Sequence, residues 1–376
     1  MRITHLKLEN WKNFRGVDLP LQRRLFVVGP NASGKSNLLD AVRFLRDIAD
    51  PEGGFQRALK SRGGVKQIRC LHARRQPNIA IEVSLRLDET DWRYRLEFAQ
   101  DKQRRPLIKK EEVFKNGVRL LDRPAPSDEE DPSRLTQTHL EQVNANQSFR
   151  DIAAFLSQIR YMHVVPQLIR ESDRTLHRPQ DPFGSDFLEQ MARTQKRILA
   201  SRLKRINKAL QVAVPQLREL RLERDDRGVP HLEGLYEHWR PNAGWQNEEH
   251  FSDGTLRLLG LLWIFLDGSA PLLLEEPELS LHMAIVRHIP SMMSRAGRKN
   301  ARQIMLSTHA ADLLTDPGIA PEEVALLTPS KDGTKVSLAA DDGQIRIQLE
   351  NGATMADAVL PRTAPRMVQQ LSLFSS

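Results

Sequence analysis

The chain has 376 residues, enough for one large domain or two ordinary ones with a sizeable core. Hydrophobic residues make up 40% and charged residues 28%, which excludes collagen-like, mucin-like and low-complexity proteins. The formal net charge of +8 suits a polyanionic partner but does not identify one.

The sequence shows no sign of export or membrane insertion. Cys70 is the single cysteine and therefore has no partner for an internal disulfide. The start of the chain lacks the apolar core of a secretory signal. The longest apolar run, Leu258–Leu266, is far short of the ~20 residues that span a bilayer. We therefore expect a cytoplasmic protein with no membrane segment.

The pattern of the first third of the chain predicts several strands and one helix. Residues 3–8 alternate apolar and polar positions, and residues 25–28 form a short apolar run typical of a buried strand. A glycine-rich turn follows, and residues 37–49 then have helical spacing. Residues 77–121 alternate as strands, with Asn116-Gly117 as a hairpin turn, which predicts an antiparallel sheet.

The middle of the chain contains two segments that differ in composition from the rest. Residues 122–148 are Pro-rich and acidic without apolar periodicity, which predicts an exposed, flexible loop. Residues 184–212 predict a helical segment whose apolar face is flanked by basic residues. We expect a helical insertion, or arm subdomain, over 166–250.

A second α/β run begins after Phe251. It comprises a helix ending near 266, a strand over 271–276, a helix from about Leu281, a strand over 303–308 and another helix. The predicted fold class is α/β, with a mixed central sheet, an antiparallel β subdomain and the helical insertion. The expected domains are 1–165, 166–250 and 251–376.

Residues 29–36, GPNASGKS, match the phosphate-binding pattern G-x-x-x-x-G-K-[S/T] between a strand and a helix. The glycines let backbone amides converge on phosphate oxygens, and the helix points its positive end at the same place. Lys35 would reach the β and γ phosphates, and the Ser36 hydroxyl would bind Mg²⁺. The predicted ligands are ATP and Mg²⁺, and the candidate binding residues are Gly29, Asn31, Ala32, Ser33, Gly34, Lys35, Ser36 and Asn37.

Two carboxylates end the strand over 271–276. Glu275 is the candidate for Mg²⁺ coordination, directly or through water, and Glu276 is the candidate general base for the attacking water. The alternative is a solvated acidic turn.

Two further sites flank this strand in the sequence. Ser252, with Gly254 beside it, can cap the following helix, and such a helix start is an anion site. His309 follows the strand over 303–308 and would lie at the carboxyl end of the sheet. The alternative for His309 is a structural histidine.

The order of these elements resembles the ABC-type ATPase heads of the SMC, RecF and OLD-like proteins. On that resemblance FSDGTLR is the signature motif, PLLLEEPELSLH is Walker B with the D-loop, and His309 is the switch histidine. LKLENWKNFRGVDL also looks like the opening of such heads. The resemblance covers residues 1–50 and 250–315 well and the middle poorly.

The sequence departs from the ABC pattern in two places. Glu275 stands where many heads have Asp, and the signature lacks the second Gly and the Gln of transporters. Both features resemble standalone OLD-like and defence-associated ATPases. The glutamine that contacts Mg²⁺ in such heads has three candidates, Gln67, Gln137 and Gln167. By analogy Arg15 and Asn13 approach the nucleotide; the alternative is an exposed loop.

The resemblance implies that Ser252 and Gly254 of one chain close on ATP held by another, giving a homodimer with two composite sites. We expect an ATPase, producing ADP and phosphate, whose dimerisation controls DNA or an effector protein in DNA repair or anti-phage defence. The alternatives are a regulatory scaffold that restrains a toxin and the nucleotide-binding subunit of a transporter. The basic segment 193–208 is the candidate for nucleic-acid contact, against a merely solvated helix face.

Overall fold

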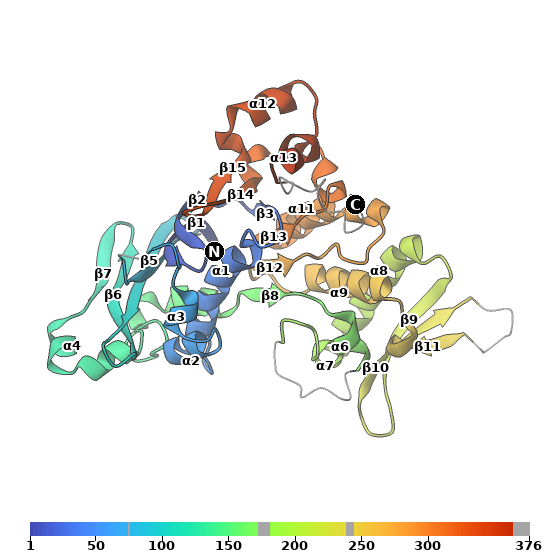
Figure 1. The fold of residues 1–376 in the computed structure, drawn as a ribbon. Helices are drawn as coiled ribbons and strands as arrows, with labels where there is room; N and C mark the ends of the chain where they lie inside the picture. Colours follow the sequence, from blue (N-terminus) through green and yellow to red (C-terminus); the bar gives the residue numbers. More distant parts are fainter. Residues whose placement is uncertain (74–75, 172–180, 238–243, 364–376) are drawn as a thin grey trace, which may run out of the picture. The chain divides into compact units, whose positions relative to one another are not determined.

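The computed structural model describes residues 1–73, 76–171, 181–237 and 244–363 (Figure 1). The chain forms two compact units. The first unit comprises Met1–Arg160, Ala270–Leu273 and the segment from Arg302 onward, and the second comprises Tyr161–Ser269 and Leu274–Ala301. The division into 1–165, 166–250 and 251–376 stays a prediction; residues 172–180, 238–243 and 364–376 lie outside the described residues.

An antiparallel sheet in the first unit confirms the strands predicted over 77–121. Its order is β2-β1-β4-β5-β6-β7, and every neighbouring pair is antiparallel. Asn116 and Gly117 join β6 to β7 with φ values of 48° and 79°, the backbone that a two-residue hairpin requires. The strands are β1 Arg2–Trp11, β2 Phe14–Pro20, β4 Ile79–Leu87, β5 Thr90–Gln100, β6 Pro106–Lys115 and β7 Val118–Arg123.

A second, mixed sheet has the order β15-β14-β3-β13-β12-β8. Strand β3 is parallel to both β13 and β14, whereas β15 is antiparallel to β14. The mixed sheet and the antiparallel sheet together confirm the predicted α/β class. The strands are β3 Arg24–Val28, β8 Arg160–Met162, β12 Leu272–Glu275, β13 Ile304–Thr308, β14 Val324–Ser330 and β15 Gly333–Leu338.

Helix α1, Lys35–Ala49, buries the predicted stripe of Leu38, Val42 and Leu45. The prediction of a helix after β13 is wrong, because only a single 3-10 turn, Asp312–Thr315, forms there. The other helices of the first unit are α2 Phe55–Lys60, α3 Val65–Ile68, α4 Pro126–Glu130, α5 Arg150–Ser157, α12 Gly343–Glu350 and α13 Met355–Thr363.

The second unit is helical where expected and adds a sheet that the sequence analysis did not anticipate. Strands β9 Leu217–Arg224, β10 Pro230–Tyr236 and β11 Trp245–Asn247 are antiparallel, in the order β11-β10-β9. None of the described helices has the length and apolar composition of a membrane span. The helices are α6 Pro166–Arg170, α7 Phe187–Ala192, α8 Lys196–Ala213, α9 Asp253–Leu266, α10 Met283–Val286 and α11 Ile289–Asn300.

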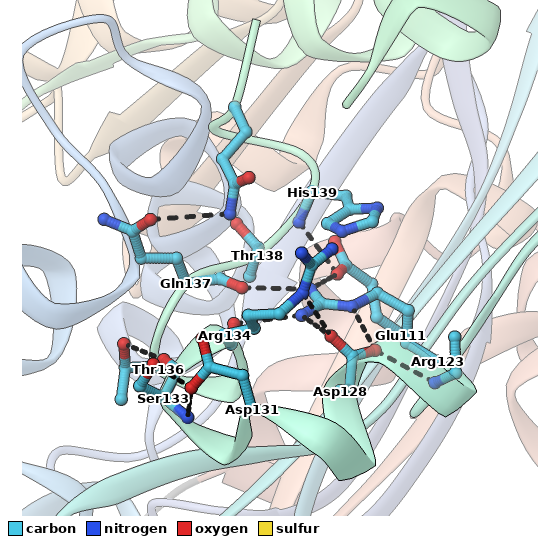
Figure 2. Close-up of polar contacts among 12 residues, drawn as sticks. Glu111, Arg123, Asp128, Asp131, Ser133, Arg134, Thr136, Gln137, Thr138 and His139 are labelled. Atoms are coloured by element: carbon cyan, nitrogen blue, oxygen red, sulfur yellow. Dashed lines mark hydrogen bonds and ion pairs between the residues drawn. The ribbon is translucent and has the colours of Figure 1, made fainter. Parts of the chain in front are cut away.

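Residues 122–148 are largely irregular and many of them are exposed, as predicted for a loop, but a buried ionic cluster fixes the start of the segment (Figure 2). The Arg123 guanidinium donates to Asp128 at 3.0 and 2.9 Å and to Glu111 at 2.9 Å. All three side chains are at most 1% exposed. The guanidinium also donates to the backbone carbonyls of Arg134 and Gln137, so one side chain fixes a long stretch of irregular backbone.

The electrostatics of this cluster follow from its burial. The hydrogen bond from Arg123 holds the pKa of Asp128 well below its usual value. Burial raises the pKa of Glu111, although Arg123 and the amides of His139 and Leu140 oppose that rise. Burial and the Arg123 charge together lower the pKa of His139 to about 4. The cluster is therefore charged at Arg123 and Asp128 and neutral at His139 near pH 7.

Replacing Arg123 by Met should lower the free energy of unfolding by about 3–5 kcal/mol, because it leaves the buried Glu111 without its cationic partner and Asp128 with only the exposed Arg134 at 3.3 Å. Urea denaturation followed by circular dichroism measures this. The matched control is Arg119→Met, since the Arg119–Asp122 pair is exposed and should contribute less than about 1 kcal/mol. Equal losses in the two variants would contradict the assignment.

Candidate functional site

The predicted phosphate-binding loop lies between β3 and α1 in the first unit. Ala32 and Gly34 have φ values of 60° and 98°, so the backbone turns sharply through the left-handed region before the helix. Gly34 is the N-cap of α1, and no side chain caps the helix there. The first amides of α1 are therefore directed at the space that the loop encloses, which is the arrangement of a phosphate site.

The loop side chains divide into buried and exposed sets. Lys35 is 7% exposed, and its ammonium donates to the backbone carbonyls of Gly29 at 3.1 Å and Pro30 at 3.4 Å. Ser33 is buried, whereas Asn31, Ala32 and Ser36 are exposed. Lys35 is thus held over the loop, and the Ser36 hydroxyl lies at the surface of the loop.

Asn13 fixes the shape of this loop from outside. Its Nδ2 donates to the Ser33 carbonyl at 2.6 Å and to Thr334 Oγ1 at 2.7 Å, and its Oδ1 accepts from Asn37 Nδ2 at 2.8 Å. A Cβ at Gly34 would lie 2.2 Å from Asn13 Nδ2, so only glycine fits there. The sequence suggests by analogy that Asn13 approaches the nucleotide, and the structure shows that it contacts the phosphate loop itself.

His309 shares a sheet edge with the phosphate loop. Thr308, the last residue of β13, pairs with Val28, the last residue of β3. Both strands therefore end at the same edge of the sheet. Gly29 follows β3 directly, and the exposed His309 follows β13. Arg15 is exposed on β2, and its approach to the nucleotide stays a prediction.

The paired carboxylates lie in the second unit. The Glu275 carboxylate accepts a hydrogen bond from the Tyr161 hydroxyl, and the Glu275 carbonyl lies 3.2 Å from His163 Nδ1. Glu276 is half-buried and has a φ of 43°, a conformation that non-glycine residues seldom adopt outside turns and functional sites. Sequence reasoning missed Tyr161 and His163, which lie more than a hundred residues before Glu275.

The start of α9 has the geometry expected of a helix cap. Ser252 Oγ accepts from the Thr255 amide at 3.2 Å, and Ser252 itself is exposed. A Cβ at Gly254 would lie 2.7 Å from the Ser280 carbonyl, so the segment after the carboxylates packs directly on this turn. Both features belong to the second unit.

The three glutamine candidates have different surroundings. Gln167, in α6, donates to Asp253 Oδ2 at 3.4 Å, beside the start of α9. Gln67 lies in α3. The Gln137 carbonyl belongs to the Arg123 cluster. Gln167 thus contacts the residue between Ser252 and Gly254, the two predicted site residues at the start of α9.

The residues fit a triphosphate with a hard cation. In the first unit, the loop offers amides and an ammonium to phosphate oxygens, and Ser36 offers a hydroxyl of the kind that Mg²⁺ binds. In the second unit, the Glu275 carboxylate is also a ligand type that Mg²⁺ prefers. Among the described residues no three His, Cys, Asp or Glu side chains cluster as a metal site of their own.

Residues 25–316 match the protein family described as "AAA domain, putative AbiEii toxin, Type IV TA system". The chain belongs to this family. Residues 3–45 of this AAA-domain protein also match the "P-loop containing region of AAA domain". The matches span both the phosphate loop and the carboxylate strand, so the chain is a P-loop ATPase by family.

Among curated proteins, short stretches are similar to DNA-maintenance proteins. Sixty residues are 38% identical to the DNA replication and repair protein RecF of Roseiflexus castenholzii, covering 16% of this chain and 15% of RecF. Forty-nine residues are 41% identical to the Structural maintenance of chromosomes protein 1 of Arabidopsis thaliana, covering 12% of this chain and 4% of that protein. The matched stretch is therefore a small part of each relative.

Among solved structures, the similar folds are SMC heads. An SmcHead bound to the C-winged helix domain of ScpA has a TM-score of 0.57 at 14% identity, over 90% of this chain and 98% of that one. The Pyrococcus furiosus Smc head bound to the C-terminal domain of ScpA has a TM-score of 0.54 at 14% identity, over 93% and 99%. The resemblance to an SMC/RecF-like ABC ATPase head is confirmed for the fold, and the OLD-like grouping stays a prediction.

Replacing Asn13 by Ala should weaken ATP binding on the order of tenfold, because the loop loses hydrogen bonds of about 1 kcal/mol each that hold its amides in place. Titration with a fluorescent ATP analogue measures the affinity. Asn207→Ala is the control, since Asn207 donates to the Arg218 carbonyl in the second unit. An N13A affinity equal to that of N207A would show that the contacts to Asn13 are dispensable.

Proposed function

We propose that this protein is an ATP-hydrolysing switch in which two copies close on two ATP molecules and reopen after hydrolysis. The observation that carries the proposal is the phosphate loop, in which Asn13 orients the backbone and α1 presents its uncapped N-terminus. The family match and the SMC-head fold support ATP as the ligand.

When ATP binds, the Lys35 ammonium breaks its hydrogen bonds to the carbonyls of Gly29 and Pro30 and binds the β and γ phosphates instead. The amides from Asn31 to Asn37 surround the same phosphates. Ser36 and Glu275 would hold Mg²⁺, which would neutralise negative charge on the phosphates. The Tyr161 hydroxyl orients the Glu275 carboxylate toward that role.

Glu276 acts as the general base. Its carboxylate accepts a proton from the water that attacks the γ phosphate, a role that needs hydrogen-bond reach of that water. The constrained backbone at Glu276 supports this assignment, because strained residues are concentrated at functional sites. His309, at the sheet edge where the phosphate loop begins, contacts the γ phosphate or this water.

Ser252 and Gly254 supply the second half of each site from the partner copy. The exposed Ser252 hydroxyl and the α9 amides face the γ phosphate across a two-fold axis, so two identical sites form together. ATP binds the closed form better than the open form and therefore shifts the population toward the dimer.

The output of the switch is control of DNA or of an effector protein, in DNA repair or anti-phage defence within the cytoplasm. RecF is a replication and repair protein, and the SmcHead structures carry ScpA, which supports a DNA-linked or protein-linked output. A second candidate is a scaffold that binds ATP and restrains a toxin; the family description, which names a toxin–antitoxin system, favours it. A transporter subunit has no comparable support.

Replacing Glu276 by Gln should keep ATP binding but slow hydrolysis by about a hundredfold or more, because an amide cannot accept the proton. The variant should accumulate a long-lived dimer with ATP, which light scattering detects.

Two controls separate the steps of this experiment. Lys35→Ala should lose tight ATP binding, and Ser252→Arg should bind ATP but stay monomeric, since bulk and charge enter the interface. A monomeric E276Q chain under saturating ATP, or wild-type turnover in that variant, would overturn the composite-site mechanism.

Helix α8 is the proposed nucleic-acid contact. It carries six Lys and Arg and no acidic residue, and Leu203, Ile206 and Leu210 bury its other face. Arg197 and Arg205 are exposed, whereas Arg202 pairs with Asp267 at 2.8 Å and lies over the Trp263 ring. Arg202 therefore has a packing role, and the exposed pair carries the proposed contact.

Replacing Arg197 and Arg205 together by Gln should weaken duplex DNA binding and reduce the salt slope of log K by about one per lost phosphate contact. Fluorescence anisotropy over a salt series measures both. Arg104→Gln with Arg227→Gln is the charge-matched control, because both arginines are exposed and lie outside the basic segment 193–208. A slope that matches this control would remove α8 from the interface and leave the ATPase proposal intact.

A further inference from the structure

Asp253 is an unexpected residue at a phosphate-binding helix start. It is the first residue of α9, between the Ser252 and Gly254 that the proposed function places on a γ phosphate. A carboxylate stabilises the positive end of a helix but repels an incoming phosphate, and the repulsion grows as an interface excludes water. The chain therefore needs a means of cancelling this charge.

Arg170 supplies the opposite charge. Its Nη2 lies 2.5 Å from Asp253 Oδ1, and the two side chains are 23% and 39% exposed. The same guanidinium donates to the Phe251 carbonyl from Nε at 3.2 Å and from Nη2 at 2.6 Å. One arginine thus binds the backbone just before Ser252 and the carboxylate just after it.

The surroundings hold this pair in place. Gln167, one turn before Arg170 in α6, donates to the other oxygen of Asp253 at 3.4 Å. Phe251 is buried, and Gly254 packs on the Ser280 carbonyl. The turn from 251 to 254 is therefore fixed from α6 on one side and from the segment after the carboxylates on the other.

A second guanidinium nearby does not replace Arg170. Arg257, one turn along α9, is buried, and its Nε and Nη1 have no hydrogen-bond partner among the described residues. Its charge acts on Glu278 and Glu276 as well as on Asp253. Arg170 is the cation in direct contact with the Asp253 carboxylate.

We propose that Arg170 neutralises Asp253, so that the start of α9 accepts the terminal phosphate of a nucleoside triphosphate held by a second copy of the chain. Arg170 is a positioning residue: it acts through Asp253 and through the Phe251 carbonyl. This inference rests on the proposed function and explains how a signature motif with a carboxylate in its centre still binds an anion.

The test compares ATP-dependent dimer formation in variants built on E276Q, which accumulates the dimer. R170Q removes the charge but keeps donors for the Phe251 carbonyl, and D253N removes the carboxylate. With ATP as the probe, R170Q should leave nucleotide affinity of the monomer within about twofold and raise the dimer Kd by about tenfold or more. Adding D253N should restore the dimer Kd to within about threefold of E276Q, because no charge is left to cancel.

Two further variants separate charge from structure. R170K keeps the charge and should lose less than R170Q. R221Q removes an arginine from a comparable ion pair, Arg221–Glu233 at 2.6 Å in the same unit, and should leave the dimer Kd unchanged. If circular dichroism shows that R170Q does not fold, D253N alone provides the test. The inference then expects D253N to fold normally and to dimerise as tightly as E276Q or more tightly. If Asp253 had only a structural role as the partner of Arg170, D253N would instead destabilise the fold.

Each outcome has a separate meaning. Dimerisation of R170Q equal to that of E276Q, or a loss that D253N does not rescue, overturns the role of Arg170 while leaving the switch intact. Failure of E276Q itself to dimerise with ATP overturns the proposed function, and the inference falls with it.

Discussion

The candidate site depends on the parallel pairing of β3 with β13. Because Val28 and Thr308 pair at the ends of these strands, the phosphate loop and His309 begin at one edge of the sheet. The conformation of the phosphate loop itself follows from residues within and directly beside it. The two positive φ values turn the loop, α1 begins without a side-chain cap, and Lys35 folds back on the loop carbonyls. Without this register, the phosphate loop and His309 would not begin at the same edge of the sheet.

The parts that the sequence predicted are those whose causes are local. GPNASGKS contains its own turn residues and helix start, and Asn116-Gly117 contains the dihedral angles of its hairpin. The apolar stripe of α1 follows from helical spacing alone. These features needed no knowledge of distant residues, and the structure has each of them where the pattern placed it.

The parts that the sequence missed depend on distant partners. Residues 122–148 look polar enough for a loop, yet Arg123 is buried because Glu111 lies on a neighbouring strand and Asp128 follows five residues later. The Tyr161–Glu275 and Arg170–Asp253 contacts join segments more than eighty residues apart. Charge patterns do not reveal such pairs, because each residue alone is typical of a surface.

The contact between Asn13 and Thr334 has a consequence for how the chain acquires its nucleotide loop during synthesis. β13 and Thr334, which support the loop, are synthesised some three hundred residues after residues 29–36. Pairings of such long sequence separation form late, since loop closure must precede them. A nascent chain thus carries the phosphate-binding sequence before the strand pairing and the Thr334 contact that support its loop can form.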